Sequence, residues 1–341
     1  MQQFASDNQA GICPEALAAM SAANAGHEPS YGDDRWTQAL RARMRTLFET
    51  DACETFLVFN GTSANALALT ALCRPFEATI CHALSHIETD EAAAPEFFTG
   101  GAKLLTADTP DAKLTPEAVR RLATRYEGFH HVKARALSLT QATELGTIYT
   151  AGELGALTGI AREHGLKVHM DGARFANAVA TLGCAPAEIS WRAGIDVLSF
   201  GATKNGLAVG EAIVFFDPAL ADAFAWRVKQ TGQLASKMRF VAAPWCAMLE
   251  GDVWLRNARH ANAMAKRLAD RLAGIPGVRL LHPVEANAVF ADIPVAVQAA
   301  VRAKGWRFYT FLGETGCRLM CAWDTAPETV DRFAGDLARV T

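Results

Sequence analysis

The segment 197–206 carries Lys204 just beyond a short apolar run, inside a polar turn that contains glycine. The apolar run predicts a buried strand. A lysine at the end of such a strand is a candidate for forming an imine with a carbonyl compound, because burial or a nearby cation lowers the pKa of an amine and makes it nucleophilic. The chain has only nine lysines, and only Lys204 stands in this context.

Asp171 ends a second expected strand, about the length of a helix and two connections before Lys204. Adjacent strands of a parallel sheet would bring both groups to the carboxyl edge of the sheet, where open α/β sheets bind their ligands. A carboxylate there can pair with the protonated ring nitrogen of pyridoxal phosphate and keep the ring cationic. The alternative is a simple cap on the following helix, a common position for aspartate. Lys204 favours the cofactor interpretation.

Two more polar segments could complete such a site. Gly61 and Thr62 follow an apolar run and begin an alanine-rich helix, whose first N–H groups could bind a phosphate or could form a plain helix cap. His86 and Asp90 are four positions apart, on one face of an expected helix. A histidine there could stack on the cofactor ring or transfer protons near neutral pH, although a lone histidine is more often a surface or core residue.

The pattern of apolar segments predicts two domains of an α/β protein. The chain has 341 residues, half of them hydrophobic, which suffices for two cores. Strand-like and helical segments alternate up to about residue 250, which predicts a mainly parallel sheet covered by helices on both faces. We therefore expect a large domain at 1–250 and a smaller α+β domain at 251–341. The expected strands are 55–59, 79–82, 134–139, 166–170, 197–200 and 212–216, then short ones near 278–281, 287–292, 307–311 and 317–321; the expected helices are 35–49, 116–126, 152–164, 174–182 and 252–272.

Charge and cysteine usage exclude several classes of protein. The formal charge of −3 and the lack of basic runs argue against nucleic-acid binding. No uncharged apolar stretch approaches the ~20 residues of a membrane span, and the first residues lack the pattern of a signal peptide. The eight scattered cysteines predict free thiols in a reducing compartment, the cytoplasm. Cys317 and Cys321 have no histidine or third thiol nearby, so no metal site is expected.

Taken together, these motifs resemble the low-specificity L-threonine aldolases, members of the β-eliminating lyase group of pyridoxal-phosphate enzymes. The likeness runs nearly end to end, and its specificity lies in the order and spacing of several motifs. It implies an α/β type I pyridoxal-phosphate (aspartate aminotransferase-like) fold, with a mainly parallel seven-stranded sheet and a smaller C-terminal α+β domain. The matching residues are Ser6-Asp7, Tyr31-Gly32-Asp33-Asp34, Gly61-Thr62-Ser63-Ala64-Asn65, His86, His169-Met170-Asp171-Gly172-Ala173-Arg174, Thr203-Lys204-Asn205-Gly206 and Arg318.

The resemblance also implies a role for each matching residue. Lys204 would hold pyridoxal 5'-phosphate covalently, Asp171 would salt-bridge its ring nitrogen, and His86 would stack on the ring. The remaining cofactor contacts would come from Gly61, Thr62, Arg174 and Thr203, and the substrate carboxylate would be held by Ser6, Arg174 and Arg318. Family members are usually dimers or tetramers that share active sites, and the residues lent by a neighbour would be Tyr31, Lys229 and Arg239.

The chain departs from the family pattern at two places. Many relatives have Ser-Lys-Gly around the lysine, where this chain has Thr203-Lys204-Asn205. Many also have a Glu-Asn-Thr-His segment whose histidine lies near the substrate hydroxyl, where this chain has Gln-Ala-Thr-Glu at 141–144. The acceptor of the hydroxyl proton therefore stays open: His86 with Asp90 is the first choice, and Glu144 or Glu88 the alternatives. His130 and His131 precede an expected strand, which would place them at the wrong edge of the sheet.

The expected activity is retro-aldol cleavage of L-threonine, L-allo-threonine and related β-hydroxy-α-amino acids to glycine and an aldehyde. The alternative is another type I pyridoxal-phosphate enzyme: a phenylserine-preferring aldolase, a β-eliminating lyase or an aminotransferase, because the pocket selects which bond breaks. A dinucleotide-dependent oxidoreductase would need a Gly-x-Gly-x-x-Gly turn, which the turn at Gly61 lacks. A non-catalytic protein would have no need of the full set of site residues.

Overall fold

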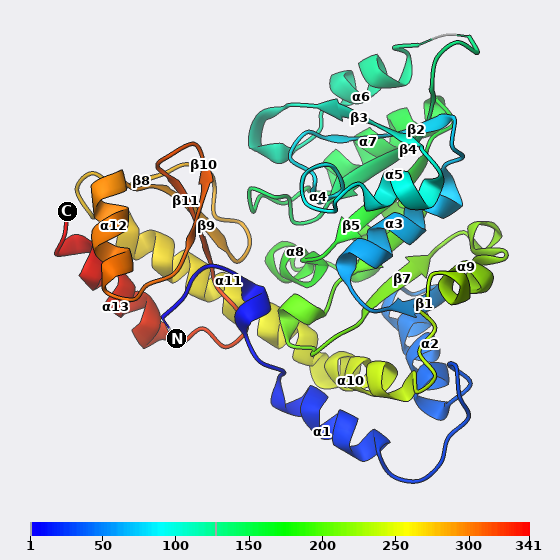
Figure 1. Ribbon diagram of the computed structural model, residues 1–341, viewed down its shortest axis with the longest axis horizontal. Helices are drawn as coiled ribbons and strands as arrows, with labels where there is room; N and C mark the ends of the chain where they lie inside the picture. Colours follow the sequence, from blue (N-terminus) through cyan, green and yellow to red (C-terminus); the bar gives the residue numbers. More distant parts are fainter. Residues whose placement is uncertain (1, 127) are drawn as a thin grey trace.

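The computed structural model describes residues 2–126 and 128–341, which form two β-sheets. The larger sheet has the strand order β1-β7-β6-β5-β4-β2-β3 (Figure 1). Its strands are β1 (Glu54–Val58), β2 (Glu77–His82), β3 (Lys103–Ala107), β4 (Lys133–Thr140), β5 (Lys167–Gly172), β6 (Val197–Phe200) and β7 (Glu211–Phe215).

The larger sheet is mainly parallel, as expected. Strands β3, β2, β4, β5 and β6 pair in parallel, whereas β7 runs antiparallel to both of its neighbours, β6 and β1. The six strands expected in this region agree with the observed ones to within two residues. Strand β3 was not expected. It lies at the edge of the sheet and exposes Lys103 and Thr106, so it lacks the continuous apolar run of a strand buried on both faces.

Helices cover both faces of this sheet. One face packs against α3 (Gly61–Leu72), with α5 (Ala94–Thr99) and α9 (Phe224–Gln230) beside it. The other face packs against α2 (Arg35–Leu47), α6 (Pro116–Ala123), α7 (Ala151–Glu163) and α8 (Phe175–Leu182), and α1 (Pro14–Ala23) and α10 (Arg239–Leu249) extend this layer. No helix in the described ranges is both long and apolar enough to span a membrane.

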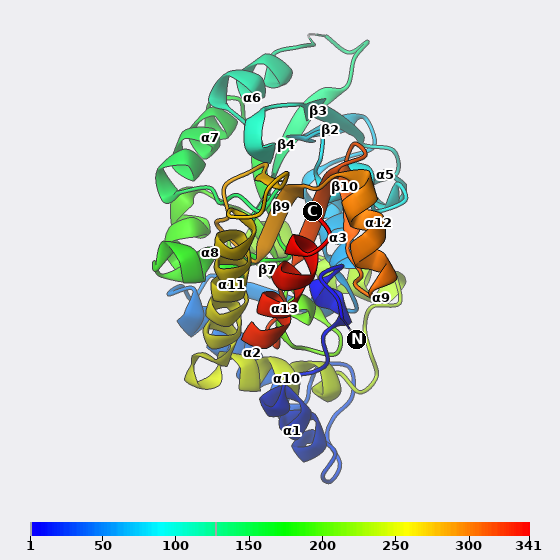
Figure 2. The ribbon, with the colours of Figure 1, turned by 90° about the vertical axis from the view of Figure 1, so that its left-hand side faces the viewer.

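The smaller sheet is antiparallel and packs against three helices. Its strand order is β10-β11-β9-β8. The elements are α11 (Val253–Leu272), β8 (Arg279–Leu280), β9 (Ala288–Asp292), α12 (Val295–Ala303), β10 (Tyr309–Leu312), β11 (Gly316–Met320) and α13 (Pro327–Ala338). Figure 2 looks onto this part of the molecule, with α11 and α13 side by side.

Helix α11 joins the two parts of the molecule. Its first turns contribute Trp254 and Ala258 to the core of the large sheet, and its last turns contribute Leu268 and Leu272 to the core of the small sheet. The N-terminal segment also reaches the small core, where the ring of Phe4 stacks on Trp306 at 5.8 Å between centroids. Because α11 belongs to both cores, the expected boundary at 250/251 stays a prediction.

The ends of β5 and β6 approach each other unusually closely. The Gly201 N–H donates to the carbonyl oxygen of Gly172 at 3.0 Å. A Cβ atom on Gly201 would lie 2.6 Å from the carbonyl oxygen of Ala173, and one on Gly172 would lie 2.8 Å from that of Ser199. Both contacts are with backbone, which cannot move aside cheaply, so these two positions require glycine.

We expect Gly201→Ala to lower the free energy of unfolding by about 1–3 kcal/mol, the usual cost of inserting a carbon into close-packed structure. Urea titration of the variant measures this change. Gly155→Ala is a matched control, because Gly155 lies in α7 with nothing near its Cβ position. That variant should gain about 0.5–1 kcal/mol from the lower conformational entropy of its unfolded chain. Equal effects of the two changes would contradict this explanation.

Candidate active site

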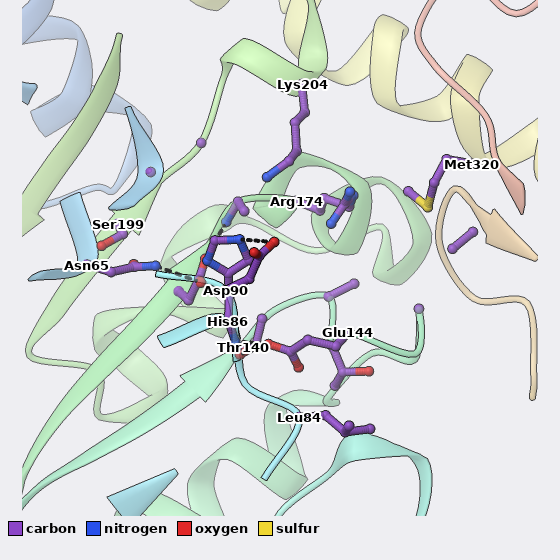
Figure 3. Close-up of a pocket in the computed structure, with 18 of the residues that line it drawn as sticks. Asn65, Leu84, His86, Asp90, Thr140, Glu144, Arg174, Ser199, Lys204 and Met320 are labelled. Carbon is purple, nitrogen blue, oxygen red and sulfur yellow. Dashed lines mark hydrogen bonds and ion pairs between the residues drawn. The ribbon is translucent and has the colours of Figure 1, made fainter. Parts of the chain in front are cut away.

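A cavity of about 960 Å³, partly open to solvent, lies at the carboxyl ends of β4, β5 and β6. The N-terminus of α3 forms one wall, and the small sheet covers the other side, where Figure 3 shows Met320. Arg318, on the same strand β11, also lines this side. Eight of the candidate functional residues proposed from the sequence line it: Gly61, His86, Asp90, Glu144, Asp171, Arg174, Lys204 and Arg318.

Lys204 and Asp171 meet in this cavity. Asp171 lies on β5, and Lys204 follows the adjacent parallel strand β6. Asp171 is 4% exposed; its Oδ2 accepts from Asn65 Nδ2 at 2.9 Å, and its Oδ1 accepts from the Ala173 N–H at 2.9 Å. The helix-cap interpretation of Asp171 was wrong, because the following helix α8 begins at Phe175 with Arg174 as its N-terminal flanking residue. The two neighbouring strand ends thus hold the lysine and the carboxylate in one site.

A buried carboxylate fixes the turn that carries Lys204. Glu211 on β7 accepts from the backbone N–H groups of Ala202 at 2.5 Å and Thr203 at 3.5 Å. Burial raises the pKa of Glu211, although these hydrogen bonds and the charge of Lys204 oppose the rise. Glu211 also lines the cavity, so its side chain forms part of the cavity wall and holds the turn that carries Lys204.

One end of the cavity offers donors for an anion. The side chain of Asn60 caps α3 by accepting from the Ser63 N–H, which leaves the N–H groups of Gly61 and Thr62 at the start of the helix for a ligand. The hydroxyl of Thr203, beside Lys204, is buried and has no partner among the described residues. Thr62 and Thr203 do not themselves line the cavity.

The imidazole of His86 is held from behind by a buried glutamate. His86 begins the short helix α4 (His86–Thr89), and its Nδ1 lies 2.7 Å from Oε1 of Glu91, whose side chain is fully buried. The hydrogen bond with Glu91 raises the pKa of His86. Asn65 Nδ2 donates to the same Glu91 oxygen at 2.8 Å and also to Asp171, so one amide links the two carboxylates. This network was not foreseen from the sequence.

The candidates for handling a hydroxyl proton differ in their surroundings. Asp90 is exposed over 85% of its side chain and lies 3.8 Å from Nε2 of His86. Glu144 lines the cavity with one carboxylate oxygen buried and unpartnered among the described residues. Glu88 is exposed and does not line the cavity, and neither do His130 and His131, which precede β4 at the opposite edge of the sheet.

The two arginines of the cavity have different environments. Arg174 binds Asp7 in a bidentate ion pair, with Nε to Oδ2 at 2.7 Å and Nη2 to Oδ1 at 2.9 Å. Burial alone would raise the pKa of Asp7, but the charge and hydrogen bonds of Arg174 outweigh it and lower the pKa. Arg318 has no partner for its buried Nε among the described residues, and burial together with the charge of Arg174 lowers its pKa. Arg318 is therefore the more available of the two for an incoming anion.

Two proposed substrate-binding residues do not line this cavity. Ser6 caps a short turn at Asp7–Gln9, next to the aspartate that binds Arg174. Tyr31 is half exposed at a separate surface, where Lys229 Nζ lies 4.8 Å from the centre of its ring. Arg239 donates to the carbonyl oxygen of Gly26 and is likewise absent from the cavity wall.

The residues present fit pyridoxal phosphate. A cavity-facing lysine, a carboxylate on the neighbouring strand, a histidine beside them and open N–H donors at a helix start are the groups that this cofactor requires. The Thr203 hydroxyl, next to Lys204, is buried and unpartnered among the described residues, although Thr203 does not line the cavity. Among the described residues, no cluster of three or more His, Cys, Asp or Glu side chains could hold a metal ion.

Fold and site together define an enzyme of the type I pyridoxal-phosphate class. The family model described as "Beta-eliminating lyase" matches residues 3–296, so the chain belongs to the β-eliminating lyase family and is a lyase that uses pyridoxal phosphate. Serine palmitoyltransferase of S. paucimobilis shares the fold alone, with a TM-score of 0.76 and 17% identity over 99% of this chain and 86% of that one.

Within the family, the chain is similar to low-specificity L-threonine aldolases. That of Pseudomonas aeruginosa is 57% identical over 339 residues, which is 99% of this chain and 98% of the relative. That of Escherichia coli is 29% identical over 76% of each chain. The structure of the threonine aldolase of Leishmania major superposes with a TM-score of 0.94, at 28% identity and 99% coverage of both chains.

We expect Glu91→Gln to lower the pKa of His86, because the amide keeps the volume but removes the negative charge that stabilises the imidazolium. NMR titration of the imidazole signals of the cofactor-loaded protein measures the shift. Asp90→Asn is the matched control, since Asp90 is exposed and lies farther from the ring. A larger shift for Asp90→Asn than for Glu91→Gln would contradict the assigned cause.

Proposed function

We propose that the protein cleaves the Cα–Cβ bond of L-threonine, L-allo-threonine and related β-hydroxy-α-amino acids, giving glycine and an aldehyde. The observation that carries this proposal is that Lys204 and Asp171 line the same cavity as two arginines, Arg174 and Arg318. The similarity to low-specificity L-threonine aldolases over nearly the full chain supports the choice of substrate. A phenylserine-preferring aldolase, a β-eliminating lyase and an aminotransferase are the alternatives on the same fold.

In this proposal the cofactor is held from both ends. Lys204 binds it covalently, Asp171 pairs with the ring nitrogen, and His86 lies against the ring. The phosphate binds at the start of α3, to Gly61 and Thr62, with the Thr203 hydroxyl as a further donor. When bound, pyridoxal phosphate supplies a cationic ring that accepts the electron pair of the broken bond. Arg174, fixed by Asp7, keeps one guanidinium nitrogen free to contact cofactor or substrate.

Arg318 and Arg174 would hold the substrate carboxylate, with Ser6 nearby. A guanidinium can grip a carboxylate through two parallel hydrogen bonds, which fixes the rotation of the bound amino acid. That rotation decides which bond at Cα stands perpendicular to the cofactor ring and therefore breaks. The rings of Phe311 and Tyr309 lie 5.0 and 5.6 Å from the Arg318 guanidinium and keep that side chain in place.

Incubation of the cofactor-loaded protein with L-threonine alone tests the proposal. We expect glycine and acetaldehyde in equal amounts, with no added keto acid, because the reaction divides one molecule into two. A strict requirement for a keto acid would identify an aminotransferase instead. Release of ammonia and 2-oxobutanoate would identify a β-eliminating lyase.

We also propose a homodimer or homotetramer with shared active sites. Tyr31 and Lys229 lie together outside the cavity of their own chain, and Phe59 and Trp226 expose 62% and 76% of their surface. Sedimentation velocity of the cofactor-loaded protein should show a species of at least twice the mass of the chain, and a monomer would contradict the proposal.

The eight free cysteines, seven of them buried, support a cytoplasmic location, which cell fractionation would check.

A further inference from the structure

The connection that follows β4 brings a glutamate to the rim of the cavity. Glu144 lies there beside the start of α4, and Figure 3 places it on the Thr140 side of His86. Its Oε1 accepts two hydrogen bonds, from the His86 N–H at 2.9 Å and from the Thr140 hydroxyl at 2.8 Å. Its Oε2 is buried and accepts none from the described residues. One oxygen is thus anchored, and the other is buried at the cavity wall without a hydrogen-bond partner among the described residues.

The surroundings of Glu144 suit a group that must both take up and give back a proton. Burial, and next the negative charge of Asp171, raise the pKa of Glu144 to about 7. General bases work best when their pKa lies near the working pH. The titratable groups whose charges interact with Glu144 are Asp171 on β5, Arg174 after β5, Cys81 on β2 and Tyr149 before α7. The backbone N–H of His86 also donates a hydrogen bond to Glu144.

The other acids and bases of the cavity are less suited to accept a proton. The hydrogen bond with Glu91 raises the pKa of His86 and occupies its Nδ1. Asp90 is largely exposed, so water competes for its oxygens. Glu91 does not line the cavity, and its Oε1 already accepts from both His86 and Asn65.

We infer that Glu144 is the catalytic residue that binds the β-hydroxyl group of the substrate and accepts its proton when the Cα–Cβ bond breaks. The inference rests on the proposed function. The hydroxyl O–H bond breaks, and the proton goes to Glu144 Oε2. The O–H electron pair becomes the second bond of the aldehyde carbonyl, while the pair of the Cα–Cβ bond remains on the Cα side. One proton is then added at Cα to give glycine. This proton replaces the one lost from the hydroxyl group, so the two products together contain the atoms of the substrate.

The variant Glu144→Gln tests this role with little disturbance of the fold, because the amide oxygen can still accept from the His86 N–H and the Thr140 hydroxyl. We expect kcat for L-threonine cleavage to fall about 10²–10⁴-fold, the usual contribution of a general base. In the unmodified protein kcat/KM should fall as the pH drops through about 7, because the carboxylate must be ionised to accept the proton. The residual rate of the variant should lose this decline.

Two further measurements separate a catalytic from a structural role. Glycine has no hydroxyl group, so exchange of its Cα proton with deuterated water should stay within a few-fold of normal in Glu144→Gln. The visible absorbance of the bound cofactor should also be retained. Glu163→Gln is the matched control, because it makes the same change at an exposed position of α7 outside the cavity, and it should keep its cleavage activity.

The inference would be overturned if Glu144→Gln cleaved threonine within a few-fold of the normal rate. It would also be overturned if Asp90→Asn alone lost cleavage, or if Glu144→Gln lost glycine exchange and cofactor absorbance together with cleavage. Failure of the unmodified protein to cleave threonine while it still exchanged the glycine proton would instead refute the proposed function.

Discussion

The site depends on the close contact between the ends of β5 and β6. Only glycine at 172 and 201 lets the two backbones come this near, and the hydrogen bond between these residues fixes their register. Asp171 immediately precedes one glycine, and Lys204 follows the other by three positions. A change in this contact would therefore alter the separation of Lys204 and Asp171, the two groups that we propose bind opposite ends of the cofactor ring. The geometry of the site is set by the larger sheet, and the loops and the small sheet complete it.

Most of the buried charged side chains around Lys204 and Asp171 form ion pairs or hydrogen bonds with one another. Asp7 neutralises Arg174, and Glu91 stabilises a positive charge on His86. Asn65 connects Glu91 to Asp171 through its two amide hydrogens. Several buried atoms at the site nevertheless have no partner among the described residues. They include Arg318 Nε and Glu144 Oε2 on the cavity wall, Thr203 Oγ1 beside Lys204, and Glu91 Oε2 and Asn65 Oδ1 in the network behind His86. Leaving such groups unsatisfied costs about 1–3 kcal/mol each, which a bound ligand can recover. Arg318 and Glu144 line the cavity, where we propose that the substrate carboxylate and hydroxyl bind.

Much of the fold could be predicted from the sequence, because strands buried on both faces appear as continuous apolar runs. Strand β3 could not, since its exposed side chains interrupt that signal. Lys204 and Asp171 could be predicted as site residues because Lys204 follows a buried strand and Asp171 lies at the end of another. The partners of the site residues could not, because they come from distant parts of the chain. Asp7 pairs with a residue 167 positions away and Asn65 with one 106 positions away, and no local pattern encodes such contacts.

The most direct test of the central claim is to reduce the cofactor-loaded protein with borohydride and map the modified peptide by mass spectrometry. Reduction makes the bond between cofactor and lysine permanent, so the label reports which amine lay beside the carbonyl carbon. The account predicts the cofactor on the peptide that contains Lys204. A label on any of the other eight lysines, or no label at all, would contradict it.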